Sequence, residues 1–106
     1  MFQELRQYKI REGKMDAWVE FMETVIIPFQ VSKGMVITGS YRGENDDTLY
    51  VWTRRFDSEA ERERLYDSVY NSDTWRDEIA PMVGELMDGP PVSVQRIVCT
   101  PRSPAQ

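Results

Sequence analysis

The sequence predicts an α+β domain of the ferredoxin-like type, a βαββαβ chain that builds a four-stranded antiparallel sheet with both helical segments on one face. Three observations predict it: two regions with apolar residues at helical spacing, four short strand-like segments around them, and turn-forming residues at the junctions. The chain has 106 residues, which suits one domain with a buried core. We therefore expect a single domain over residues 1–106, with residues 101–106 as an extended tail.

The first predicted elements are a strand and a helix. Residues 2–10 (FQELRQYKI) alternate in polarity as a strand does, and residues 11–13 supply a turn. From Lys14 onward, apolar residues recur three and four positions apart, which is typical of an amphipathic helix. Pro28 lacks the amide hydrogen that a helix needs, so we expect a bend there, and Gly34 suits the left-handed conformation that ends helices. The apolar stripe consists of Met15, Trp18, Met22, Val25 and Phe29.

A hairpin follows the first helix. Residues 35–43 and 49–56 are predicted strands, and the acidic loop formed by residues 44–47 connects them. Ser58 is followed three positions later by Glu61, a capping box that predicts the start of the second helical region.

The second helical region is predicted to be interrupted before the last strand. Residues 71–73 break it and begin a second piece, in which Trp75 belongs to the apolar stripe. Pro81 predicts a kink and Gly89 an end. Residues 92–100 are then the fourth strand.

The strand 49–56 (LYVWTRRF) carries large apolar residues on both faces. Leu49 and Val51 share one face, whereas Tyr50 and Trp52 share the other. Since both helical layers cover the same face of this fold, one of the two sets must lie on the uncovered face, and the sequence leaves open which one. Such an apolar face is unusual on a monomer. We therefore expect a second copy of the chain to cover it, giving a two-fold homodimer, a dimeric α+β barrel.

Three stretches of the sequence suggest a family. LYVWTRRFDSEAERERLYDSVYNSDTW, taken with ELRQYKIREGK near the start and CTPRSP near the end, resembles the NIPSNAP family of the dimeric α+β barrel superfamily. The resemblance covers about residues 2–104 and implies the fold and the homodimer described above. It implies no particular reaction.

Composition excludes several classes of function. The net charge of −5 disfavours nucleic-acid binding, which needs a basic surface. The chain has no histidine, and this removes Ser-His-Asp and Cys-His catalysis, the common zinc sites and the usual haem ligand, although haem ligation by tyrosine is left open. The single cysteine, Cys99, excludes an internal disulfide. We expect no metal, no cofactor, no membrane insertion and a cytoplasmic location.

Polar and aromatic residues on the first and third strands are the candidates for ligand binding. Arg54 shares a face with Tyr50 and Trp52, and either it holds an anion in a cavity or it forms an internal ion pair with Glu4 of the neighbouring strand. The face shared by Glu4, Arg6 and Tyr8 supports either a polar cavity floor or a core tyrosine with a satisfied hydroxyl. The candidate ligand-binding residues are Arg6, Tyr8, Tyr41, Tyr50, Trp52 and Arg54.

Large aromatic side chains with polar tips are better suited to lining a cavity than to filling a close-packed layer. The first hypothesis is therefore a homodimer that binds a small organic molecule in a cavity between the two sheets, with no assigned reaction. A second is a cofactor-independent monooxygenase or isomerase acting on an activated aromatic or polyketide-like substrate, as the superfamily resemblance implies. A third is a dimerising interaction module with no ligand, in which the layer between the sheets is filled.

Overall fold

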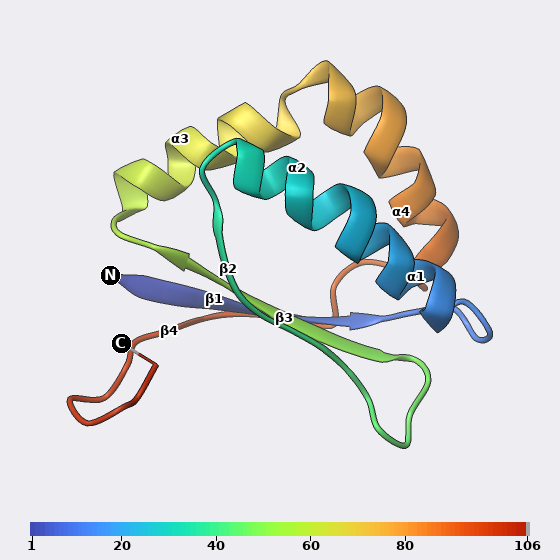
Figure 1. The fold of residues 1–106 in the computed structure, drawn as a ribbon, viewed down its shortest axis with the longest axis horizontal. Helices are drawn as coiled ribbons and strands as arrows, with labels where there is room; N and C mark the ends of the chain where they lie inside the picture. Colours follow the sequence, from blue (N-terminus) through green and yellow to red (C-terminus); the bar gives the residue numbers. More distant parts are fainter. Residues whose placement is uncertain (106) are drawn as a thin grey trace.

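The computed structural model describes residues 1–105 and contains one four-stranded antiparallel sheet with all helices on one face (Figure 1). The spatial order of the strands is β2-β3-β1-β4, so β3 and β1 are the two central strands of the sheet. The predicted ferredoxin-like α+β fold is confirmed. The strands are β1 (Phe2–Lys9), β2 (Val36–Arg42), β3 (Leu49–Phe56) and β4 (Ser93–Ile97).

Two helical layers cross the same face of the sheet, and each is built from several pieces in succession (Figure 1). The first layer connects β1 to β2, and the second connects β3 to β4. Its first piece begins as the sequence predicts, because Ser58 Oγ accepts a hydrogen bond from Glu61 N at 3.1 Å. The pieces are α1 (Met15–Phe21), η1 (Met22–Ile26), α2 (Ile27–Ser32), α3 (Glu59–Tyr70), η2 (Thr74–Ile79) and α4 (Ala80–Leu86).

Both layers contain a π-helical turn shortly before a proline. The turn η1 ends two residues before Pro28, and η2 ends two residues before Pro81. A proline within a helix cannot donate to the carbonyl four residues earlier, and its ring crowds that carbonyl, so a wider turn accommodates it. The bends that the sequence predicts at these prolines are therefore realised as π-helical turns, a feature frequent at functional sites.

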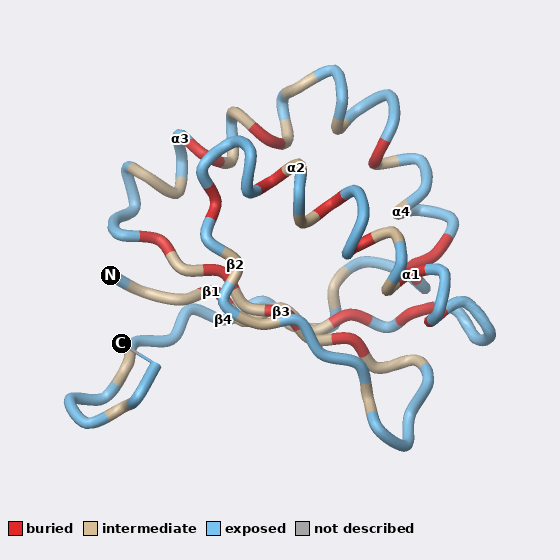
Figure 2. The backbone as a smooth tube through the Cα atoms, viewed as in Figure 1, coloured by how far each residue is buried: buried red, intermediate tan, exposed pale blue. Residues whose placement is uncertain are grey.

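The structure decides which face of β3 the helices cover. Burial alternates strictly along the strand, with the even-numbered residues buried beneath the helices and the odd-numbered ones partly exposed on the other side (Figure 2). Glu4, Arg6 and Tyr8 of β1 lie opposite Arg54, Trp52 and Tyr50 in the register, so they share the covered face. The buried members of β3 are Tyr50, Trp52, Arg54 and Phe56.

The face of the sheet without helices carries both exposed apolar side chains and hydrogen-bonded polar ones. Tyr41 and Ile97 are 59% and 40% exposed, and their register pairs them with residues of this face. Beside them, Thr38 Oγ1 donates to Gln3 Oε1 at 2.7 Å and lies 2.7 Å from Thr53 Oγ1. The aromatic side chains Tyr50 and Trp52 are buried under the helices. Burying these rings removes more apolar area from water than burying Leu49 and Val51 would.

The C-terminal part of the chain differs from the prediction. The strand β4 ends at Ile97, three residues earlier than expected, and most of it is exposed (Figure 2). Residues 101–105 form turns rather than an extended tail, and Ser103 N donates to Thr100 O at 3.0 Å. Gln106 lies outside the described residues. Within residues 1–105, no helix is both long enough and apolar enough to cross a lipid bilayer.

Candidate functional site

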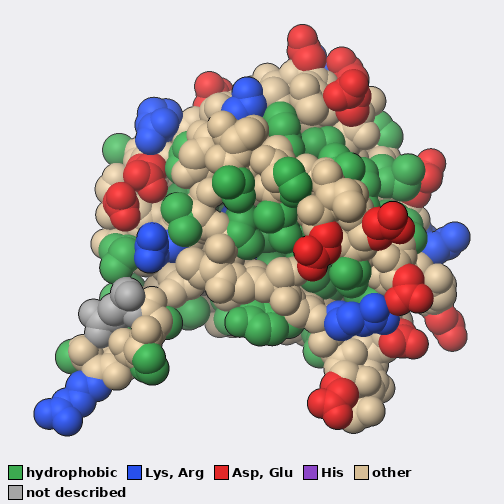
Figure 3. All heavy atoms as spheres, in the orientation of Figure 1, with side chains coloured by type: hydrophobic (Ala, Val, Ile, Leu, Met, Phe, Trp, Pro, Cys, Tyr) green, Lys and Arg blue, Asp and Glu red, His purple; other side chains and the backbone are tan. Residues whose placement is uncertain are grey.

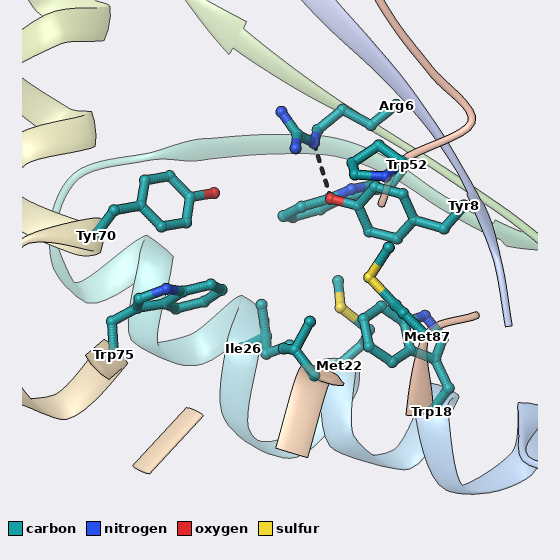
Figure 4. Close-up of a pocket in the computed structure, with 11 residues that line it drawn as sticks. Arg6, Tyr8, Trp18, Met22, Ile26, Trp52, Tyr70, Trp75 and Met87 are labelled. Atoms are coloured by element: carbon teal, nitrogen blue, oxygen red, sulfur yellow. Dashed lines mark hydrogen bonds between the residues drawn. The ribbon is translucent and has the colours of Figure 1, made fainter. Parts of the chain in front are cut away.

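A cavity of about 170 Å³ lies between the sheet and the two helical layers (Figure 4). Its wall is mostly aromatic and aliphatic, and it includes all 3 tryptophans of the chain. The π-helical turns contribute directly to this wall, with Met22 and Ile26 from η1 and Trp75 from η2. The remaining lining residues are Arg6, Tyr8, Trp18, Trp52, Tyr70, Val83, Met87 and Pro91.

Arg6 and Tyr8 of β1 form the polar part of the wall. Arg6 Nε donates to Tyr8 Oη at 2.8 Å, and its Nη1 donates to Glu4 Oε1 at 3.2 Å and to Tyr66 Oη at 3.3 Å. Its Nη2 has no hydrogen-bond partner among residues 1–105. The side chain of Arg6 keeps 16% of its exposure, so it is reachable from the cavity and from solvent.

Hydrogen-bond donors also come from Tyr8 and Trp52. Burial raises the pKa of Tyr8, and the nearby Arg6 guanidinium only partly opposes this, so the phenol stays protonated at neutral pH. Its oxygen accepts the hydrogen bond from Arg6, which leaves its own hydrogen available for another acceptor. The indole nitrogen of Trp52 is buried, and the part of the chain that the structure describes offers it no partner.

Arg54 lies beside the cavity in a cluster of polar groups that are already bonded to one another. The side chain is 0% exposed. Its Nη2 donates to Glu4 Oε1 at 2.6 Å and to Tyr66 Oη at 2.8 Å, and its Nη1 donates to Tyr70 Oη at 2.7 Å and to Gln30 Oε1 at 3.0 Å. The internal ion pair with Glu4, one of the two arrangements that the sequence allows, is therefore present. We name these five residues the Arg54 cluster.

Aromatic rings and one carboxylate complete the electrostatics of the Arg54 cluster. The guanidinium carbon of Arg54 lies 4.8 Å from the ring centre of Trp52 and 5.1 Å from that of Tyr66. Burial alone would raise the pKa of the Glu4 carboxyl. The charge of Arg54 and hydrogen bonds from Tyr66 and Arg54 outweigh it, so the pKa is lowered and Glu4 is ionised at neutral pH.

The candidate ligand-binding residues from the sequence fall into three places. Arg6, Tyr8 and Trp52 line the cavity. Tyr50 is buried beside Tyr8 and its hydroxyl lies 2.7 Å from Ser40 Oγ, whereas Arg54 lies in the cluster. Tyr41 lies on the opposite face of the sheet, together with Val51, its register partner. The expected position of these residues between two sheets is therefore corrected, since all except Tyr41 lie under the helices.

The helical half of the wall is not apparent from the sequence pattern. Helical spacing assigns Trp18, Met22 and Trp75 to apolar stripes that pack against the sheet. Helical periodicity shows that a residue points inward but not whether neighbouring layers meet there. One signal is present in the sequence: Trp18 and Trp75 both lie on predicted inward faces of helices, and such large rings are hard to pack without gaps.

Metal binding finds no support in the described part of the chain. Across residues 1–105, no group of three or more cysteine, aspartate or glutamate side chains converges as metal ligands do. The one cysteine, Cys99, receives only a weak hydrogen bond, from Gln3 Nε2 at 3.9 Å.

Comparison with known proteins gives one family and several similar structures. The family model described as NIPSNAP matches residues 3–89. No curated relative matches the chain. A NIPSNAP family protein from Agrobacterium tumefaciens is 19% identical with a TM-score of 0.86, covering 99% of this chain and 98% of that one. Another from the same organism, of unknown function, is 20% identical with a TM-score of 0.88, covering 100% and 94%.

A more distant structural neighbour is described as a putative antibiotic biosynthesis monooxygenase from Nitrosomonas europaea. It is 15% identical, has a TM-score of 0.68, and the alignment covers 93% of this chain and 98% of that one. At such identities, the similarity establishes the shared fold.

Proposed function

The chain belongs to the NIPSNAP family, and from that premise we propose that it binds a small, largely aromatic molecule in the cavity between its sheet and its helices. The observation that carries this proposal is the cavity of about 170 Å³, partly open to solvent, whose wall is mostly aromatic and aliphatic. Protein interiors are close-packed, and voids among apolar side chains reduce stability. A chain that keeps such a void next to unpaired hydrogen-bond donors is suited to binding a ligand there.

The volume limits the size of the ligand. Pockets for drug-sized molecules measure roughly 300 to 1,000 Å³. A cavity of about 170 Å³ suits a molecule with a single ring and a short substituent. The aromatic wall provides edge and face contacts for that ring.

The homodimer belongs to the same proposal. Tyr41 and Ile97 are exposed on the helix-free face, and a second copy packed sheet to sheet would bury both. In this arrangement each protomer keeps its own cavity beneath its own helices. Sedimentation velocity checks it: a dimer at micromolar concentration that Tyr41→Lys converts to monomer supports this interface, and a monomeric wild type contradicts it.

Cofactor-independent oxygenation or isomerisation is the second candidate function. The structural neighbour described as a putative monooxygenase favours it, as does the position of Arg6 and Tyr8, which could stabilise an enolate or phenolate formed from the substrate. The raised pKa of Tyr8 argues against this phenol as a general base, so the substrate itself must ionise readily. Oxygen consumption with phenolic substrates, measured on the wild type and Tyr8→Phe, tests this candidate.

Tryptophan fluorescence gives a direct test of the binding function because all 3 tryptophans line the cavity. We expect titration with benzamide, a neutral single-ring probe, to change the emission in a saturable way. Val83→Phe, which fills the cavity from α4, should abolish this change. Val31→Phe adds the same bulk at an exposed position of α2 outside the cavity and serves as the matched control.

The outcomes separate binding from nonspecific quenching. Saturation in the wild type and in Val31→Phe, together with its loss in Val83→Phe, supports the proposed function. A linear response that is identical in all three proteins, up to millimolar probe, would show that the cavity does not take up single-ring molecules. The interaction module without a ligand would then be the better description.

A further inference from the structure

We infer that the ligand of the cavity is an anion, an aromatic carboxylate or phenolate whose negative group is held by Arg6 together with Tyr8 and Trp52. This inference rests on the proposed function, because it concerns the same cavity and adds the chemical class of its ligand.

The unpaired polar groups around the cavity are all hydrogen-bond donors. Arg6 Nη2 has no partner within residues 1–105, and the Tyr8 hydroxyl has its hydrogen free after accepting from Arg6 Nε. Trp52 Nε1 is buried without a partner in the described chain, and this residue is only 2% exposed. A buried donor without an acceptor, as at Trp52 Nε1, costs free energy, and Arg6 Nη2 and the Tyr8 hydroxyl hydrogen are free to bind as well, so the bound molecule should supply acceptor atoms.

The charges around the cavity also favour an anion. Two guanidinium groups, those of Arg54 and Arg6, share the single carboxylate of Glu4, and no other carboxylate within the described residues forms an ion pair with either. Arg62 lies 3.7 Å from Glu4 as well, but it has its own partner in Glu59 at 3.1 Å. This side of the core therefore has an excess of positive charge, which a bound anion would neutralise.

Both oxygens of Glu4 already accept hydrogen bonds from other groups. The Glu4 carboxylate therefore does not fully neutralise the charge of Arg6. Oε1 accepts from Arg54 Nη2 and from Arg6 Nη1, and Oε2 accepts from Tyr66 Oη at 2.6 Å. The shorter bond to Oε1, 2.6 Å against 3.2 Å, is that of Arg54. Arg6 is thus the guanidinium with the weaker internal partner.

Arg6 is also the guanidinium that a ligand can reach. Arg54 is 0% exposed and both of its terminal nitrogens are bonded within the Arg54 cluster, whereas Arg6 keeps 16% of its side-chain exposure. Val94, the register partner of Arg6 on β4, is 49% exposed although it has helix-side parity. The helices therefore leave β4 uncovered at Val94, although Glu59 of α3 pairs with Arg96 nearer the end of the strand, and a charged group can approach Arg6 from the Val94 side.

The rest of the cavity suits the ring of such a ligand. In Figure 4 Arg6 and Tyr8 lie at one side of the cavity, with Met22, Ile26 and Trp75 across from them. A single-ring carboxylate would place its oxygens at the donors and its ring against this apolar wall. A guanidinium binds carboxylates well because it offers two parallel N–H donors.

Benzoate and benzamide provide a matched pair of probes, because they have the same shape and differ in charge. We expect wild-type protein to bind benzoate at least tenfold more tightly than benzamide, as followed by tryptophan fluorescence. Arg6→Met should remove this preference and leave benzamide affinity within about threefold. Arg55→Met removes a guanidinium from the opposite face of the same sheet and should change neither affinity.

The outcomes distinguish this inference from the proposed function. Equal affinities for the two probes in the wild type, or a benzoate preference that survives Arg6→Met, would overturn the anion inference while the cavity remains a binding site. If neither probe binds, the proposed function itself fails. Should Arg6→Met not fold, Arg6→Lys replaces it: a preference reduced at least threefold supports the inference, and an unchanged preference contradicts it.

Discussion

Two arginines on one buried face of the sheet have very different surroundings. Arg54 lies opposite Glu4 in the register and Arg6 lies opposite Trp52, so the two belong to neighbouring strands on the same side. Arg54 is fully buried and both terminal nitrogens are bonded within the Arg54 cluster. Arg6 faces the cavity with one terminal nitrogen that has no partner among residues 1–105.

Hydrogen-bond partners and access together separate a structural arginine from a candidate binding one. In the Arg54 cluster the charge is used inside the protein, and its loss would leave buried groups unpaired. At the cavity, Arg6 has partners for Nε and Nη1 but, within the described residues, not for Nη2, so a ligand can accept a hydrogen bond from Nη2. Figure 3 shows hydrophobic side chains along the seam between the helices and the sheet, with many of the acidic side chains toward the outside of the molecule.

The largest expected effect is on folding, at Arg54. Arg54→Met leaves Glu4, Tyr70 and Gln30 without their main partner, and removing one member of a buried pair costs roughly 3 to 5 kcal/mol. We expect a loss of that size in the free energy of unfolding, measured by urea denaturation. Arg55→Met, on the partly exposed face, should change it by less than about 0.5 kcal/mol. Equal losses for the two substitutions would show that the Arg54 cluster does not stabilise the fold more than a partly exposed arginine does.

The second effect concerns Glu4 and pH. The pKa of Glu4 is lowered below its ordinary value of 4.5 in the folded protein, so the folded state binds fewer protons than the unfolded state. Its contribution to stability is therefore complete above the unfolded value and is lost as pH falls through the folded value. Glu4→Gln should cost about 3 kcal/mol at neutral pH and less in acid.

The pH dependence is checked by urea denaturation between neutral pH and the acid range, on wild type and Glu4→Gln in parallel. The difference between the two curves should narrow as the pH falls below the ordinary carboxyl range. If the two curves run parallel over the whole range, Glu4 is not the group that carries this charge.

The smallest effect on the free energy of unfolding is expected at Arg6. Arg6→Met removes hydrogen bonds to Tyr8 and Glu4, but Glu4 keeps Arg54 as its partner. We expect a loss of about 2 kcal/mol in the free energy of unfolding, in the range of hydrogen bonds to charged groups. Thermal or urea unfolding measures it, and a loss as large as that of Arg54→Met would remove the distinction between the two arginines.

The sequence predicts the elements of this fold better than its cavity. Alternation along residues 49–56 and the Ser58 capping box depend on local chemistry, and both are realised as predicted. The pairing of Arg54 with Glu4 follows from placing the first and third strands side by side. These features need only periodicity and topology.

Two features depend on tertiary packing and could not be read from the pattern. Both faces of residues 49–56 carry large apolar side chains, so alternation alone does not show which face the helices cover. The cavity exists where two helical layers fail to meet over the sheet, and the π-helical turns before Pro28 and Pro81 determine which residues line it. The prolines and the inward tryptophans mark where packing is irregular, but the sequence alone gives neither the position of the gap nor the changed helical phase.

Methionine methyl NMR during a benzoate titration shows which of the two arginines lies at the binding site, because Met22 and Met87 line the cavity whereas Met35 accepts a hydrogen bond from Arg54. We predict that the methyl signals of Met22 and Met87 shift in a saturable way while that of Met35 stays in place. Shifts confined to Met35, or no shift at any of the three, would contradict the account that the Arg6 end binds and the Arg54 end stabilises.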